Sequence, residues 1–416
     1  MSKKIINYKF KKFNTYNQKE VLAVTKVVKS GVLSGFIASK KKGMEGGYFV
    51  EKFEKQIQNF FKVKHAIVVN SWSTGLTCAV GAIGIEPGDE IILPTWTMTA
   101  CSAAILHWNA IPVFADIDPE TFCISSQSVK KLVTKKTKAI MVVDIFGMPA
   151  NYLELKKIAK KYKLKIICDS AQAPGALYNG KHSGTLGDIG GYSLNYHKHI
   201  HTGEGGILVT NNFKYAKKLK LLRNHAEAIM SDKSSKNELS NMLGNNYRMG
   251  EMEASIGIEQ LKKLNRIVNQ RIKISKSLIN KLKELPYLKL PKEYRNVKNV
   301  YYNIPILLNT KEINITRRKI KMELDKAGLQ GISEGYVNLH KQPMFTKKIC
   351  YGTKNFPWRN YNDSINYVKN RCFVAENYHD KLLLAYQGIA LYDLSKKNIN
   401  DIVKTFNFVW KKLGLI

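Results

Sequence analysis

Two residues have side chains that can carry out covalent and acid–base chemistry: Asp169, at the end of a predicted strand, and Lys198, between two predicted strands. Asp169 ends the run LKIICD, and the carboxyl ends of parallel strands are where α/β proteins bind ligands. An aspartate in this place either contacts a ligand or caps the following helix. Lys198 lies in a segment dense in glycine, histidine and serine, and the fifteen residues on either side contain no other lysine. A loop lysine is usually solvated, so the spacing leaves both a functional amine and a surface charge open.

The scaffold for these residues is predicted by short apolar runs rich in β-branched side chains. Each run is apolar on both faces, and segments with helical periodicity separate most of them. This pattern is typical of a largely parallel sheet covered by helices. The predicted strands are HAIVVN (65–70), DEIILP (89–94), IPVFADI (111–117), KAIMVVDIF (138–146), LKIICD (164–169), GGYSLN (190–195) and GGILVT (205–210).

After about residue 210 the sequence pattern changes from alternating strands and helices to mainly helical segments. A long amphipathic helix is predicted over 251–285, and two prolines in LPYLKLP end it. Strand and helix patterns are mixed after that point, with a strand in 299–308 and helices in 317–328 and 397–414. We therefore expect a large domain with an N-terminal arm over 1–265 and a smaller α+β domain over 266–416.

Charge, hydropathy and cysteine content argue against a nucleic-acid-binding, a membrane or a disulfide-rich protein. The 67 Lys and Arg residues against 32 Asp and Glu give a net charge of +35, but lysine is spread along the whole chain, and no basic helix interleaved with aromatic residues is present. We expect solvated helix faces and no nucleic-acid role. No apolar run reaches the length of a signal peptide or membrane span, which predicts a cytoplasmic protein that does not bind membranes. The six cysteines form no CxxC pair and are expected to be buried free thiols.

A more specific signal comes from a series of motifs in fixed order: NSWSTGL, GDEIILPTWT, PVFADID, CDSAQAPGA, GDIGGYSLNYHK, TGEGGILVT, LRNHA and NNYRMGEMEASIGIEQL. Over residues 28–265 this series resembles the DegT/DnrJ/EryC1/StrS family of sugar aminotransferases. The resemblance implies the α/β fold of pyridoxal-phosphate-dependent transferases, the fold of aspartate aminotransferase. It also implies pyridoxal phosphate as a cofactor that cycles with pyridoxamine phosphate.

The resemblance assigns roles to the central residues. The family's cofactor lysine stands five residues before the glycine of GEGG, which here places Lys198 before Gly203. Its amine binds the cofactor aldehyde and later moves the substrate proton. Asp169 matches the aspartate that pairs with the pyridine nitrogen and keeps the ring protonated, and Gln172 matches the glutamine near the ring hydroxyl.

The phosphate is bound in this family by a Ser-Gly-Thr turn at a helix start. Here Trp72 replaces the small residue of that turn, while Ser73 and Thr74 keep hydroxyl groups. Ser193 matches a second phosphate donor. Asn246 matches an asparagine that comes from the neighbouring subunit, so the resemblance implies a homodimer with shared active sites.

The residue that covers the cofactor ring is left open by the sequence. The family has an aromatic residue at the position of Met98, and Trp96 lies two residues before it. Either Met98 covers the ring through its sulfur, or Trp96 does so after a shift of the loop. Trp96, His199 and His340 are the candidate substrate contacts.

Several alternatives remain beside the aminotransferase. One branch of the family has histidine in place of the lysine and dehydrates a keto-deoxy sugar at C3, and His197, His199 and His201 surround Lys198 here. These histidines also raise the possibility of a metal site, but no ligand-spaced Asp, Glu or Cys accompanies them, so we expect no metal.

The family resemblance implies transfer of an amino group from glutamate to a nucleotide-linked keto-deoxy sugar. A small phosphorylated ketone or a cyclic polyol is the alternative substrate. A non-catalytic regulator on the same fold is the alternative from another class.

Overall fold

The chain folds around a seven-stranded sheet, and the computed structural model describes residues 4–38, 43–227, 240–309, 312–361 and 365–416. The order of the strands is β1-β9-β8-β5-β4-β2-β3, and every neighbouring pair is parallel except those that β9 makes with β1 and β8. All seven strands predicted from the sequence form this sheet, so the α/β fold class is confirmed. They are β1 (His65–Val69), β2 (Glu90–Pro94), β3 (Ile111–Ala115), β4 (Thr137–Val143), β5 (Lys165–Asp169), β8 (Ile189–Ser193) and β9 (Gly206–Thr210).

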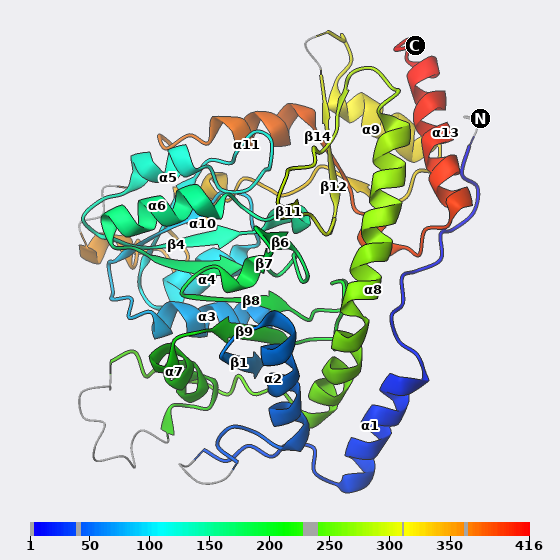
Figure 1. Ribbon diagram of the computed structural model, residues 1–416. Coiled ribbons are helices and arrows are strands. Elements are labelled where there is room, and N and C mark those ends of the chain that lie inside the picture. The colour runs from blue at the N-terminus through cyan, green and yellow to red at the C-terminus, as the bar shows by residue number, and fades with distance from the viewer. Residues whose placement is uncertain (1–3, 39–42, 228–239, 310–311, 362–364) are drawn as a thin grey trace.

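Helices cover both faces of the sheet, which is why its strands are apolar throughout. In β1, Ala66 and Val68 belong to the same core cluster as residues of α2 and α8, whereas Ile67 and Val69 pack with α3 on the other face. Figure 1 shows α5 and α6 on one side of the sheet and α3 and α7 on the other. The helices of this part are α1 (Gln18–Ser30), α2 (Tyr48–Phe61), α3 (Trp72–Ala82), α4 (Thr99–His107), α5 (Ser126–Leu132), α6 (Tyr152–Tyr162), α7 (Phe213–Arg223) and α8 (Glu251–Leu282).

A second core lies around a four-stranded antiparallel sheet of order β10-β12-β14-β13. The predicted strand and helices of the C-terminal part are present as β12, α9 and α13. A separate three-stranded sheet joins β11 to β6 and β7. The elements are β6 (Leu177–Tyr178), β7 (Lys181–His182), β10 (Leu288–Lys289), β11 (Val297–Lys298), β12 (Ile304–Leu308), α9 (Arg317–Lys326), β13 (Ile332–Ser333), α10 (Pro343–Thr346), α11 (Phe373–Asn377), β14 (Leu383–Tyr386), α12 (Gly388–Leu391) and α13 (Lys396–Lys412).

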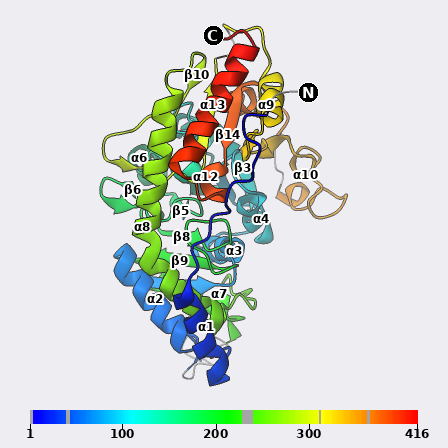
Figure 2. The same ribbon diagram turned by 90° about the vertical axis from the view of Figure 1, so that its right-hand side faces the viewer.

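The two cores are joined by shared elements. The predicted boundary at residue 265 lies within α8, whose first half packs in the core with α2 and whose last residues pack in the second core. Figure 2 shows the N-terminal arm running from the second core down to α1, and Ile6 and Phe10 of this arm are buried in that core. Conversely, Phe345 and Trp358 from the C-terminal part are buried in the large core.

Composition predicted buried free thiols and no segment long enough to cross a membrane, and the structure bears on both predictions. All six cysteines are free; five are buried and Cys350 is partly exposed. Among the described residues, no helix combines the length and the apolar character that crossing a membrane requires.

The contact between α2 and α8 gives a test of the packing. A Cβ atom at Gly257 of α8 would lie 2.4 Å from the ring of Phe53, which is fully buried. Alanine in place of glycine within a helix normally stabilises by about 1 kcal/mol, whereas overpacking a core costs about 1–3 kcal/mol. We therefore expect Gly257→Ala to lower the free energy of unfolding, measured by urea denaturation. Asn265→Ala, at an exposed position of the same helix, is the control, and a stabilised Gly257→Ala protein would show that the two helices are not closely packed there.

Candidate active site

The residues singled out in the sequence meet at one edge of the large sheet. Strands β1, β2, β5 and β8 run in the same direction, so their carboxyl ends lie together. Ser71 follows β1, Thr95 follows β2, and Asp169 and Ser193 are the last residues of β5 and β8. Lys198 lies in the connection from β8 to β9, which leaves the sheet at this same edge.

Asp169 is buried and accepts hydrogen bonds from three groups. The Trp72 indole N–H donates to Oδ1 at 2.7 Å, and the backbone N–H of Ala171 donates to the same oxygen at 3.1 Å. The thiol of Cys101 donates to Oδ2 at 3.0 Å. The aspartate is therefore oriented by side chains from α3 and α4, and it does not cap a helix.

Lys198 is also buried, and its amine lies 4.6 Å from the centre of the Tyr302 ring. Burial lowers its pKa from 10.5 to about 8; the charge of Asp169 opposes this shift, and the charge of Arg271 adds to it. A lysine with this pKa carries an appreciable neutral fraction near neutral pH. The neutral amine is the form that attacks a carbonyl group.

The three histidines around Lys198 are uncharged at neutral pH. Burial lowers the pKa values of His197 and His201 to about 4 and that of His199 well below its usual value. His199 Nε2 lies 3.0 Å from the carbonyl oxygen of Val300, so its N–H is directed into the protein. In the part of the chain that the structure describes, no group of three or more His, Cys, Asp or Glu side chains could hold a metal ion.

The start of α3 supplies donors of the kind that bind an anion. Ser71 caps the helix by accepting a hydrogen bond from the Thr74 N–H at 3.2 Å, and the Thr74 hydroxyl is directed at Asn70 Oδ1 at 2.7 Å. Both groups of Thr74 are thus used within the helix start, whereas the side chain of Ser73 is exposed. Ser193 is buried, and its Oγ accepts from the Asn195 N–H at 3.2 Å.

Gln172 and Asn246 differ in their surroundings. Gln172 is buried, accepts from the Phe146 N–H at 2.8 Å and donates to the Tyr336 hydroxyl at 2.7 Å. Asn246 is exposed, and its carbonyl oxygen accepts from Asn70 Nδ2 at 3.4 Å, beside the start of α3. Its side chain is accessible in the single chain.

Met98 and Trp96 are now distinguished by exposure. Met98, at the start of α4, is 56% exposed, whereas Trp96 is completely buried and donates its indole N–H to Asn338 Oδ1 at 2.8 Å. Trp96 also stacks on Phe122 in the core. Only Met98 presents its side chain at the surface beside the site.

The three side chains expected to contact substrate, Trp96, His199 and His340, are each at most 1% exposed in the single chain. His340 lies with Nδ1 2.7 Å from the Thr95 hydroxyl and Nε2 3.1 Å from Glu376. All three side chains make hydrogen bonds within the protein, and their contact with a substrate stays a prediction.

Sequence reasoning missed three residues that contact or act on the central pair. These are Tyr302, Cys101 and Arg271, which the structure brings to Lys198 or Asp169. Neither motif nor spacing pointed to them. Trp72 did carry a signal, as a departure from the small residue of its turn.

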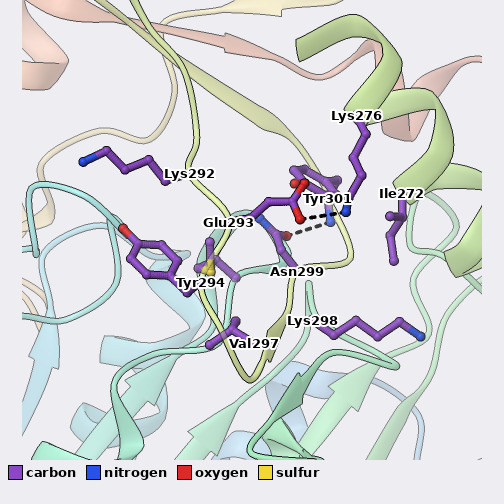
Figure 3. Close-up of a pocket in the computed structure, with 10 residues that line it drawn as sticks. Ile272, Lys276, Lys292, Glu293, Tyr294, Val297, Lys298, Asn299 and Tyr301 are labelled. Atoms are coloured by element: carbon purple, nitrogen blue, oxygen red, sulfur yellow. Dashed lines mark hydrogen bonds and ion pairs between the residues drawn. The ribbon is translucent and has the colours of Figure 1, made fainter. Parts of the chain in front are cut away.

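A separate hollow of about 140 Å³ lies between α8 and the segment that carries β11 (Figure 3). Two of the lysines that line it pair with acidic residues: Lys276 with Glu293 at 2.7 Å, and Lys292 with Glu120 at 2.8 Å. It contains none of the residues described above, and we assign no chemistry to it.

The site and the fold can now be compared with known proteins. The model of the DegT/DnrJ/EryC1/StrS aminotransferase family matches residues 33–365. A GDP-perosamine synthase of Vibrio cholerae is 32% identical over 75% of this chain and 81% of its own length. Among solved structures, an aminotransferase from Psychrobacter cryohalolentis superposes with a TM-score of 0.81, at 24% identity over 98% of this chain and all of its own. The GDP-4-keto-6-deoxy-D-mannose-3-dehydratase of E. coli with bound hydrated PLP gives 0.79, at 26% identity over 96% and 99%.

The lowered pKa of Lys198 predicts a pH-dependent stability of the protein without ligand. Between pH 8 and 10.5 the unfolded chain binds more protons at Lys198 than the folded protein does, so the free energy of unfolding rises with pH in this window. Lys198→Met removes this titration. We expect the variant to be more stable than the wild type below pH 8, and its advantage to shrink by about 3 kcal/mol as the pH rises through the window.

The measurement is denaturant unfolding of both proteins at a series of pH values. Lys214→Met, at an exposed position of α7, controls for the loss of a surface charge. A stability difference between the wild type and Lys198→Met that does not change with pH would contradict the lowered pKa.

Proposed function

This chain belongs to the DegT/DnrJ/EryC1/StrS aminotransferase family, and we propose that it transfers an amino group from glutamate to the keto group of a nucleotide-linked keto-deoxy sugar, with pyridoxal phosphate as cofactor. The observation that carries the proposal is the pair formed by Lys198 and Asp169. A buried amine of lowered pKa and a buried carboxylate lie at one sheet edge, close enough for the charge of one to act on the other.

The donor set of the site fits this cofactor group by group. Lys198 offers an amine for the aldehyde, and Asp169 offers an acceptor for a protonated ring nitrogen. The start of α3, with Ser73, and the hydroxyl of Ser193 offer donors for a phosphate. Met98 is exposed beside these groups and is the side chain that we propose to cover the ring.

Each residue has a defined task in the proposed reaction. When bound, pyridoxal phosphate supplies an aldehyde that combines with amines and a ring that accepts the electron pair of a broken C–H bond. Lys198 would bind the aldehyde through its Nζ and, once released, would take the proton from the substrate carbon and deliver it to the cofactor. Asp169 would hold the proton on the ring nitrogen. Gln172, fixed by Phe146 and Tyr336, would face the ring hydroxyl.

Two comparisons support a nucleotide-linked sugar as substrate. The synthase from V. cholerae is named for a GDP-linked sugar, and so is the dehydratase from E. coli. The dehydratase makes C3 dehydration the competing reaction. We favour amino transfer because Lys198, and not a histidine, occupies the lysine position of the family motif.

The function is tested by incubating the protein with pyridoxal phosphate, glutamate and a panel of GDP- and TDP-linked 4-keto-6-deoxy sugars, with mass spectrometry as readout. We expect the keto oxygen to be replaced by an amino group and 2-oxoglutarate to appear. Lys198→Ala is the matched control and should give no product, and borohydride should fix no cofactor on it, because residues 182–213 contain no other lysine. Loss of a sugar hydroxyl without amination would instead identify a dehydratase.

A second copy of the chain is the partner that we propose to complete the site. An apolar patch on α1 and the following turn is formed by side chains that are 49 to 56% exposed: Val21, Leu22, Val28, Val32 and Leu33. Such a patch is typical of an interface between subunits. Leu33 is also tied to the segment that follows the exposed Asn246, since its carbonyl oxygen accepts from the Glu251 N–H at 3.1 Å. We propose that Asn246 binds the cofactor phosphate in the partner's site.

Subunit exchange tests this arrangement. If Asn246 acts across the interface, a dimer of one Lys198→Ala chain and one Asn246→Ala chain has one intact site and one site with both defects. Random pairing makes half of the dimers mixed, so mixing two inactive variants should restore up to about a quarter of the wild-type activity. Separately refolded variants are the control. If mixed dimers are present and no activity returns, Asn246 acts within its own chain, beside the start of α3 where its backbone lies.

A further inference from the structure

Trp72 stands where the phosphate-binding turn of the family has a small residue, and its side chain is not directed at the phosphate site of that turn. It is buried with 6% of its surface exposed, and its indole N–H donates to Asp169 Oδ1 at 2.7 Å. The two residues are 97 positions apart. The substitution therefore adds a neutral donor to the one carboxylate on which the proposed chemistry depends.

Two glycines leave the space that the Trp72 indole occupies. A Cβ atom at Gly191 of β8 would lie 2.3 Å from the indole ring, and one at Gly75 of α3 would lie 2.9 Å from it. Neither position accepts even a methyl group without displacing the indole. The ring is thus clamped between a strand and its own helix, and its N–H has a fixed direction toward Asp169.

The acceptor capacity of Asp169 is divided unequally between its two oxygens. Oδ1 accepts from both Trp72 and Ala171, which uses its two lone pairs. Oδ2 accepts from Cys101 alone, and the Cys101 sulfur lies 3.0 Å from the Thr97 hydroxyl, which holds it in place. One lone pair is left for a further donor, and it is on Oδ2.

From this division we propose that Trp72 is a positioning residue that fixes the Asp169 carboxylate so that Oδ2 accepts a hydrogen bond from the protonated ring nitrogen of the cofactor. The inference rests on the proposed function. Trp72 acts through Asp169: its N–H stabilises the negative charge and prevents rotation of the carboxylate. Cys101 assists from the other side as a weaker donor.

Trp72→Phe tests this, since phenylalanine keeps an aromatic ring in the clamp and removes the N–H. A positive charge on the ring nitrogen disfavours a second proton on the same conjugated system. The absorbance of the bound cofactor changes with pH because this second proton is lost as the pH rises. If the proton on the ring nitrogen is held less well, the second proton is held more tightly, and the pH midpoint of the absorbance change rises. We expect this rise, together with a fall in kcat of about tenfold, the order set by losing one hydrogen bond to a charged group.

Trp108→Phe is the matched control. Trp108 lies in the same domain and donates its indole N–H to the Thr77 carbonyl at 2.8 Å, away from Asp169. We expect it to leave the absorbance midpoint and kcat unchanged. Cys101→Ala is the second variant if Trp72→Phe does not fold, and it should raise the midpoint by a smaller amount.

A double-mutant comparison separates this inference from the proposed function. In an Asp169→Asn background, Trp72→Phe should cause no further loss of kcat, because the residue through which it acts is gone. An equal loss in both backgrounds, or an unchanged midpoint in every variant that binds the cofactor, would overturn the positioning role of Trp72. Full activity of Asp169→Asn alone would refute the role of Asp169 in the proposed function instead.

Discussion

The site depends on two buried groups of opposite charge that form no salt bridge with each other. Asp169 and Lys198 lie at one sheet edge, and the carboxylate acts on the pKa of the amine, yet its hydrogen bonds come from an indole, a thiol and a backbone N–H. Neutral donors stabilise the carboxylate without neutralising it. The lysine is buried as well, and burial lowers its pKa to about 8, which leaves it a nucleophile near neutral pH.

The charge of Arg271 also favours the neutral form of the Lys198 amine. Arg271 is buried against the ring of Phe13, and its charge lowers the pKa values of Lys198 and of the neighbouring histidines. The histidines contribute no positive charge at neutral pH. With no positive charge from the histidines, Arg271 is the cation that adds to the effect of burial on the pKa of Lys198.

The scaffold explains how a large side chain can stand in a turn that usually carries a small one. In the parallel sheet both faces are packed, so an added indole needs space taken from its neighbours. Gly75 and Gly191 provide it. The departure at Trp72 is therefore matched by its surroundings, and the start of α3 keeps its helix cap at Ser71.

The sequence by itself determined the strands of the large sheet, the long helix α8, the placement of Asp169 at a strand end and that of Lys198 between two strands. These follow from local periodicity and from motif order, which act over a few residues to a few tens of residues. Only the tertiary structure decided that Trp72 and Cys101 hold Asp169, that Tyr302 lies under Lys198, and that Trp96, His199 and His340 are buried. These contacts join segments that are between 68 and 245 residues apart or depend on which way a side chain points from its loop, and neither is encoded in local sequence patterns.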